Sequence, residues 1–157
     1  MPSPSPRVSS VRFVWSPDCD GEPDYLETSP ESHYGQDGSA WAHVAPEDIQ
    51  RVEAEYGSLW DACVAYAKQD ADRLTKFKSD DWWFEGCYAV AEILYESSPG
   101  CFRLDRLRSA GLWGIESDSG QDYRRSVEAD ELTDLSLHLE QFGISASVDD
   151  LMALTSN

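Results

Sequence analysis

The chain has 157 residues and a formal net charge of −18, because 30 Asp and Glu side chains outnumber 12 Lys and Arg. Hydrophobic residues make up 41% of the chain, which is enough to bury a core and excludes a chain that is disordered throughout. The negative charge argues against direct binding to nucleic-acid phosphates or to an anionic membrane, since both need a basic patch.

Targeting signals and cysteine chemistry point to one compartment. No apolar run approaches the roughly 20 residues of a membrane span, and the N-terminal MPSPSPRVSS lacks the apolar core of a signal peptide. The four cysteines, Cys19, Cys63, Cys87 and Cys101, form no C-x-x-C pair and have no closely spaced histidines. We therefore expect four reduced thiols, no cofactor and no zinc, in a protein that acts in the cytoplasm of a host cell.

The N-terminal third predicts one strand followed by a long loop. Residues 1–7 alternate Pro and Ser and predict a flexible leader. Residues 8–15 carry apolar side chains at every second position on one parity, with Arg12 on the other, which predicts a strand. Residues 16–45 are rich in Pro, Gly, Ser and acids without any period, and we expect a long acidic loop there.

A helix is predicted next. Pro46 stands at a favourable first helical position, and apolar residues recur every three or four positions from Ile49 to Phe77. The pattern predicts an amphipathic helix of about 30 residues, which Gly57 can break.

The following segment favours strands. Residues 82–95 are rich in aromatic and β-branched residues and predict a strand, although AVAEIL alone would suit a helix. Two of the three aromatic side chains at positions 82–84 are expected in the core. A turn at 97–100 leads to short strands at 101–104 and 112–115, in which Trp113 and Ile115 share a parity and should both point into the core.

The C-terminal part predicts helices. Leu132, Leu135, Leu139 and Phe142 form a stripe on a helix over 121–142. Ser147 and Asp150 form an S-x-x-D pattern that is typical of a capped short helix.

These elements predict one α+β domain over residues 8–157. The expected architecture of this domain is a small antiparallel sheet of about three strands with two main helices packed on one face. The expected order of the elements is β-α-β-β-α.

The acidic side chains are gathered in two places. No Lys or Arg occurs between Arg12 and Arg51, and a second acidic cluster begins at Glu116 and continues through the last long helix. Like charges three or four positions apart on a helix destabilise it by a few tenths of a kcal/mol each, so folding alone would not select them. The residues that we expect to contact a partner are Asp18, Asp20, Glu22, Asp24, Glu128, Glu131 and Asp134.

Carboxylates on neighbouring helix positions lie roughly 5–6 Å apart and can imitate phosphates. The leading hypothesis is therefore a non-enzymatic acidic protein that occupies the basic groove of a host nucleic-acid-binding defence protein, as a DNA mimic of the anti-CRISPR or anti-restriction type. An acidic surface that serves only solubility remains the alternative reading of the charge. A third possibility is an obligate dimer formed through a sheet edge or exposed tryptophans.

A metal site is the alternative from another class. Asp18, Asp20, Glu22 and Asp24 alternate as in a calcium loop, but Pro23 and Ser29 stand where such a loop needs Gly and Glu. A metal-binding module or metal-dependent enzyme would use Asp18, Asp20 and Asp24, or Glu116 with Asp118. No G-x-S-x-G, G-x-G-x-x-G or P-loop pattern occurs, so nothing indicates a catalytic serine or a bound nucleotide.

Two segments carry a resemblance. The run W-G-I-E-S-D-S at 113–119, before an acidic helix, resembles a signature of uncharacterised small acidic proteins of phages and plasmids. The stretch from Asp18 to Glu27 is similar to an acidic element near the start of those proteins. The resemblance implies a mobile-element accessory protein, a class in which inhibitors of host defence are common.

Overall fold

The chain divides into two compact units. The computed structural model describes residues 5–155. Unit 1 comprises Met1–Gly21 with Trp83–Asn157, and unit 2 comprises Glu22–Trp82, where the sequence led us to expect one domain over 8–157.

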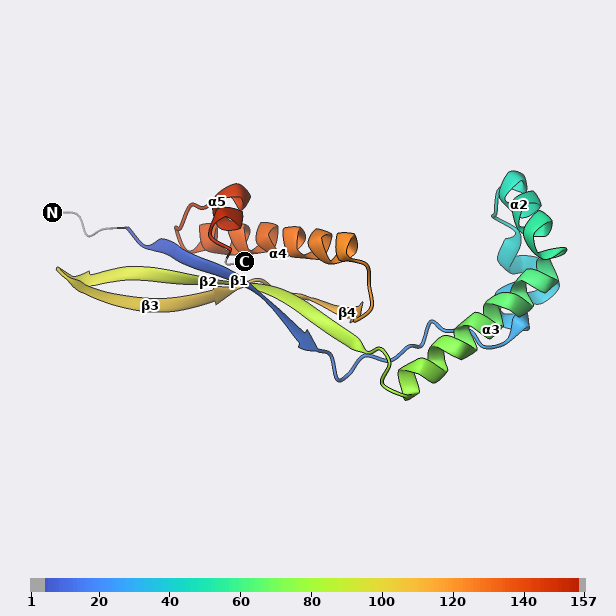
Figure 1. The fold of residues 1–157 in the computed structure, drawn as a ribbon. Helices are drawn as coiled ribbons and strands as arrows, with labels where there is room; N and C mark the ends of the chain where they lie inside the picture. The colour runs from blue at the N-terminus through green and yellow to red at the C-terminus, as the bar shows by residue number, and fades with distance from the viewer. Residues whose placement is uncertain (1–4, 156–157) are drawn as a thin grey trace. The chain divides into compact units, whose positions relative to one another are not determined.

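Unit 1 is an α+β fold with an open antiparallel sheet, which confirms the predicted fold class (Figure 1). Its helices lie on one face of the sheet. The elements are β1 (Arg7–Pro17), β2 (Phe84–Ser98), β3 (Cys101–Arg108), β4 (Leu112–Glu116), α4 (Gln121–Gln141) and α5 (Val148–Ala153). Residues 1–4 of the predicted leader lie outside the described residues, and Arg7, the last residue of that leader, already belongs to β1.

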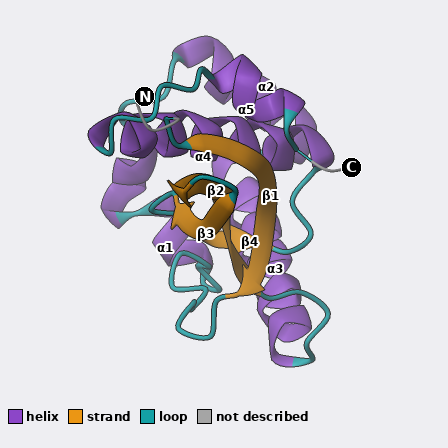
Figure 2. Ribbon diagram, turned by 90° about the vertical axis from the view of Figure 1, so that its left-hand side faces the viewer, coloured by secondary structure: helices purple, strands orange, loops and turns teal. Residues whose placement is uncertain are grey.

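Strand β2 is the centre of the sheet. It pairs with β1 along most of its length, from Glu85 to Leu94, and Figure 2 shows how strongly β1 curves. Its other edge is shared by β3, which pairs with residues 90–98, and β4, which pairs with residues 84–87. Residues 109–111 connect β3 to β4, and the edge of the sheet is interrupted there.

The core of unit 1 lies between the sheet and α4. Odd-numbered residues of β2 face the helix, and small side chains at Ala89 and Ala91 allow a close approach. The helix contributes the predicted leucine stripe, Leu132, Leu135 and Leu139, all fully buried. Phe142 was predicted to extend this stripe but follows the last helical residue and is 65% exposed.

The short helix α5 begins as predicted. Ser147 Oγ accepts from the backbone N–H of Asp150, and the Asp150 carboxylate accepts from the backbone N–H of Ser147. These two bonds form a capping box. They also lower the pKa of Asp150 below its ordinary value, with the bonds to Ser147 as the main cause.

Strand β4 corrects one prediction about the core. Ile115 is buried as expected, but Trp113 is 47% exposed. Glu85 pairs with Ile115 and Cys87 with Leu112, so three steps along β4 oppose two along β2, and a bulge lies between them. Gly114 sits in this bulge at a φ of +75°, which breaks the alternation and turns Trp113 to the opposite face of the sheet.

Unit 2 is helical. Its elements are α1 (Pro30–Tyr34), the 3₁₀ helix η1 (Gln36–Trp41), α2 (Pro46–Tyr56) and α3 (Leu59–Lys78). The predicted helical segment is broken at Gly57, the position where the sequence allowed a break, and a φ of +95° at this residue separates α2 from α3. The prediction of a long loop over 16–45 is wrong at Ser16 and Pro17, which belong to β1, and over most of 30–41, where Ser29 caps α1 and η1 follows.

The helix that packs on the sheet of unit 1 is α4, together with the short α5. Helices α2 and α3 belong to unit 2, where α3 buries Ala62, Cys63 and Ala67 and packs against α1. At the end of unit 2, Trp82 is buried, as is Phe84 in β2, whereas Trp83 is 47% exposed, so two of these three aromatic residues are in the core as predicted.

Candidate functional site

The carboxylate of Glu131 is buried inside unit 1. It accepts a hydrogen bond from Ser109 Oγ at 2.5 Å and another from the backbone N–H of Gly111 at 3.1 Å. Ser109 Oγ in turn accepts from the backbone N–H of Ala89 at 2.8 Å. Glu131 is only 7% exposed, so the expectation that it contacts a partner is wrong. Its carboxylate instead satisfies donors that the interrupted sheet edge leaves without strand partners.

Two neighbouring carboxylates of α4 also bind within unit 1. Asp134 accepts from the backbone N–H of Ala110 at 2.7 Å, and His138 Nδ1 lies 3.6 Å from its carboxylate. Glu128 accepts from the indole N–H of Trp15 in β1 at 3.0 Å. The α4 carboxylates predicted for partner binding therefore fasten this helix to the sheet.

The inner side of α4 also carries an ion pair that the sequence did not single out. Arg124 Nη1 donates to the carboxylate of Glu85, whose side chain is 11% exposed. The guanidinium also lies 3.7 Å from the ring centroid of Trp15. From the sequence alone, Arg124 only reduces the net negative charge of the helix. The structure shows that it forms an ion pair with the buried carboxylate of Glu85.

These groups set the chemistry of a buried thiol. Cys87 is fully buried, and this burial, with the nearby charges of Glu128 and Glu131, raises its pKa to about 12. A thiol with this pKa stays protonated at neutral pH and is a poor nucleophile. Cys87 is therefore a core residue. All four cysteines are free, as predicted, and Cys19 and Cys101 are exposed.

The four acids of the predicted calcium-like loop belong to different units. Asp18, in unit 1, accepts from the backbone N–H of Gly114 at 3.1 Å and from that of Asp20 at 3.2 Å, so it holds the β4 bulge. Asp20 is exposed at the end of the same unit. Glu22 and Asp24 are exposed residues of unit 2.

The segment of unit 2 over residues 22–50 contains no Lys or Arg. We call it the cation-free segment. It is held in place by Ser29, which caps α1, and by His33, whose Nε2 lies 2.8 Å from the carbonyl oxygen of Glu27 and 3.1 Å from the Asp70 carboxylate. Its exposed carboxylates are those of Glu22, Asp24, Glu27, Glu31, Asp37 and Glu47.

The metal-site alternative finds no support in this geometry. Among residues 5–155, no three His, Cys, Asp or Glu side chains are grouped so that they could hold a metal ion. Asp18 and Asp20 are linked by a hydrogen bond, but Asp24 lies in the other unit. In the same residues, no helix combines the length and the apolar character needed to cross a membrane.

Comparisons with known proteins give no match: no family model, no curated protein and no solved structure is similar to this chain.

Proposed function

We propose that the protein is a non-enzymatic acidic interaction protein that binds a basic partner through the cation-free segment. The observation that carries this proposal is the contrast in exposure between acidic residues. The carboxylates of Glu128, Glu131 and Asp134 in α4 are used inside unit 1, whereas those of the cation-free segment reach solvent. No Lys or Arg of the segment itself neutralises them.

The partner that fits this surface is a nucleic-acid-binding protein with a cationic groove. Such grooves are built to neutralise closely spaced phosphates, and carboxylates held on helices and turns offer a similar spacing of negative charge. Opposite fields also speed the encounter of the two proteins. By occupying the groove, the protein would inhibit a host defence enzyme of the CRISPR or restriction type.

Competition with DNA tests this proposal. A fluorescent duplex is bound to a purified basic nuclease or restriction enzyme, and fluorescence anisotropy follows its displacement by the full chain. We expect displacement that weakens steeply as salt rises, because screening acts on exposed charges. The variant Glu22→Lys, Asp24→Lys, Glu47→Lys should compete at least ten-fold less well.

A matched variant separates a specific surface from bulk charge. Asp122→Lys, Asp130→Lys and Glu140→Lys change the net charge equally at exposed positions of α4. This control should compete almost as well as the unchanged protein. Equal loss in both variants, or no displacement from any enzyme tested at low salt, would contradict the proposal.

A further inference from the structure

The sheet of unit 1 has one face that no helix of this unit covers (Figure 1). Even-numbered residues of β2 and their partners on β1 and β3 point to this face, opposite to the core. In a chain of net charge −18, several of them are arginines. We call the following group the arginine–aromatic patch: Arg12, Tyr88, Arg106, Arg108 and Trp113.

Two arginines of the patch are available to a ligand. Arg12 and Arg108 stand on either side of Val90 in register, so their Cα atoms are roughly 10 Å apart. Both are exposed, and no carboxylate of residues 5–155 forms an ion pair with either. This differs from Arg106, which donates to Glu92 at 3.0 Å.

Glu92 does not cancel the charge of the patch. Its carboxylate accepts from Ser10 Oγ at 3.0 Å and from Arg106, and these bonds hold its pKa below the ordinary value. Glu92 is therefore ionised and forms its ion pair with Arg106, while Arg12 acts on it through space without a direct contact. Arg12 and Arg108 remain as the excess positive charge.

An indole ring is positioned beside these charges. The bulge at Gly114 turns Trp113 onto this face, and a Cβ added at Gly86 would come within 2.2 Å of the ring. The indole thus lies over the backbone of a strand that has no side chain at this point, and 47% of the residue is still exposed. Tyr88 lies beside it, with centroids 6.5 Å apart, and Arg108 stacks on Tyr88 at 5.4 Å.

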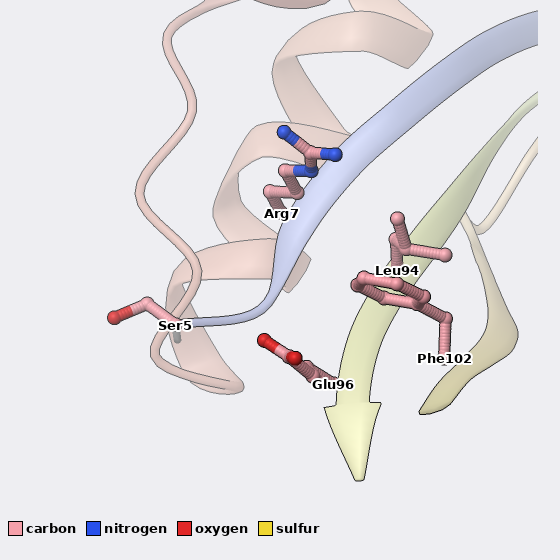
Figure 3. Close-up of a pocket in the computed structure, with 5 residues that line it drawn as sticks. All are labelled: Ser5, Arg7, Leu94, Glu96 and Phe102. Carbon is pink, nitrogen blue, oxygen red and sulfur yellow. The ribbon is translucent and has the colours of Figure 1, made fainter. Parts of the chain in front are cut away.

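The charge and shape of the arginine–aromatic patch favour one kind of ligand over others. A second copy that packed the same face against this one would bring arginines against arginines, which is unfavourable. A small molecule would need an enclosed site, and the depression at the hairpin end of this face measures only about 240 Å³ (Figure 3). A flexible polyanion with flat rings can use both the guanidinium groups and the exposed indole.

We propose that the arginine–aromatic patch binds a short single-stranded nucleic acid, with phosphates at Arg12 and Arg108 and a base stacked on Trp113. The total charge of the chain does not prevent this. At about 0.15 M salt the Debye length is about 8 Å, so carboxylates beyond the patch act only weakly on a strand bound there. The net charge of the chain argued against binding to nucleic acid, since such binding needs a basic patch. The pairing of β1 and β3 with β2 brings Arg12 and Arg108 together and forms such a patch locally.

The proposal is independent of the proposed function and uses different residues. Binding of a labelled oligodeoxythymidylate of about 12 nucleotides to the full chain is followed by fluorescence anisotropy at low and moderate salt. Trp113→Ala should weaken binding about ten-fold, the range that loss of one stacked base gives, and Trp113→Phe should restore part of it. Arg12→Glu with Arg108→Glu should abolish binding.

The control is a double charge reversal on other surfaces of unit 1. Arg103 is paired with Asp105, on the other parity of β3, and Arg125 is exposed on α4. Arg103→Glu with Arg125→Glu changes the net charge equally and should weaken binding by less than about three-fold. Circular dichroism melting confirms that each variant is folded.

Three outcomes would overturn the proposal. The first is no binding of the oligonucleotide at low salt. The second is equal weakening in the two double variants, which would reflect total charge alone. The third is equally tight binding of an oligoglutamate peptide that is insensitive to Trp113→Ala, which would identify an acidic protein as the occupant.

Discussion

The two acidic regions of this chain look alike in sequence and behave differently in the structure. In α4, the carboxylates of Glu128, Glu131 and Asp134 accept hydrogen bonds from the sheet and its connections. In the cation-free segment, carboxylates such as those of Glu22 and Glu47 reach solvent. Acidic density in a sequence therefore does not by itself mark a binding surface. What distinguishes the two regions is the supply of unsatisfied donors nearby.

The largest expected effect concerns the ion pair on the inner side of α4. Arg124→Ala leaves the Glu85 carboxylate, with a side chain only 11% exposed, without its partner. Removing one member of a buried pair is strongly destabilising, and we expect the free energy of unfolding to fall by about 3 kcal/mol in urea denaturation. The neighbouring Arg125→Ala, at a side chain 76% exposed, is the control and should change it by less than about 0.5 kcal/mol.

Similar losses of unfolding free energy in these two variants would mean that charged residues on the inner side of α4 stabilise the fold no more than those on its outer side. The contrast drawn between the two acidic regions would then be contradicted. The double variant Glu85→Gln with Arg124→Met should recover much of the loss, because it removes both charges together.

The second effect concerns Glu131. Glu131→Ala removes the acceptor for both Ser109 Oγ and the Gly111 N–H, and we expect a loss of about 2 kcal/mol. Glu131→Gln keeps an oxygen in place and should lose only about half as much. The exposed Glu140→Ala on the same helix is the control, and a loss there equal to that of Glu131→Ala would contradict the assignment.

The apolar periodicity of α4 also indicates that the carboxylates of Glu128 and Glu131 lie on the buried side of the helix. Glu128 and Glu131 each lie four positions before a leucine of the buried stripe, Leu132 and Leu135, so the same periodicity that predicts the stripe places them on its face. We interpreted them by charge alone. What the sequence could not show is the break between β3 and β4, which provides the N–H donors that make burial of Glu131 favourable.

Features of the fold that depend on local sequence were predicted, and features that depend on pairing between distant segments were not. The strands, the leucine stripe and the cap at Ser147 follow from periodicity and capping chemistry, and they were predicted. The face of Trp113 was not, because the bulge depends on pairing between β4 and β2. The division into two units also escaped prediction, since it depends on contacts between residues far apart in the sequence.

A third effect appears at alkaline pH. The pKa of Cys87 is about 12 in the folded protein, against 9.0 for a free thiol. Between these values the unfolded state has lost the proton and the folded state has kept it, so stability is full below about pH 9 and falls as pH rises. The expected slope from this group approaches about 1.4 kcal/mol per pH unit.

Urea denaturation at pH 8, 9 and 10 measures this slope, and Cys87→Ala provides the control. The variant is destabilised at every pH by the cavity, but it should lack the part of the slope that belongs to the thiol. The same slope in both proteins would show that the folded structure does not raise the pKa of Cys87, and would contradict the burial of this thiol beside the α4 carboxylates.

The smallest expected effect comes from the cation-free segment. The triple variant Glu22→Gln, Asp24→Asn, Glu47→Gln removes three exposed carboxylates, and we expect the free energy of unfolding to change by less than about 0.5 kcal/mol. Any change should be a gain at low salt that vanishes at high salt, since the variant relieves repulsion between like charges. Thermal melting at two salt concentrations measures both the size and the sign. A loss of about 2 kcal/mol, as for Glu131→Ala, would make these carboxylates structural as well, and the reason for assigning them to a partner would disappear.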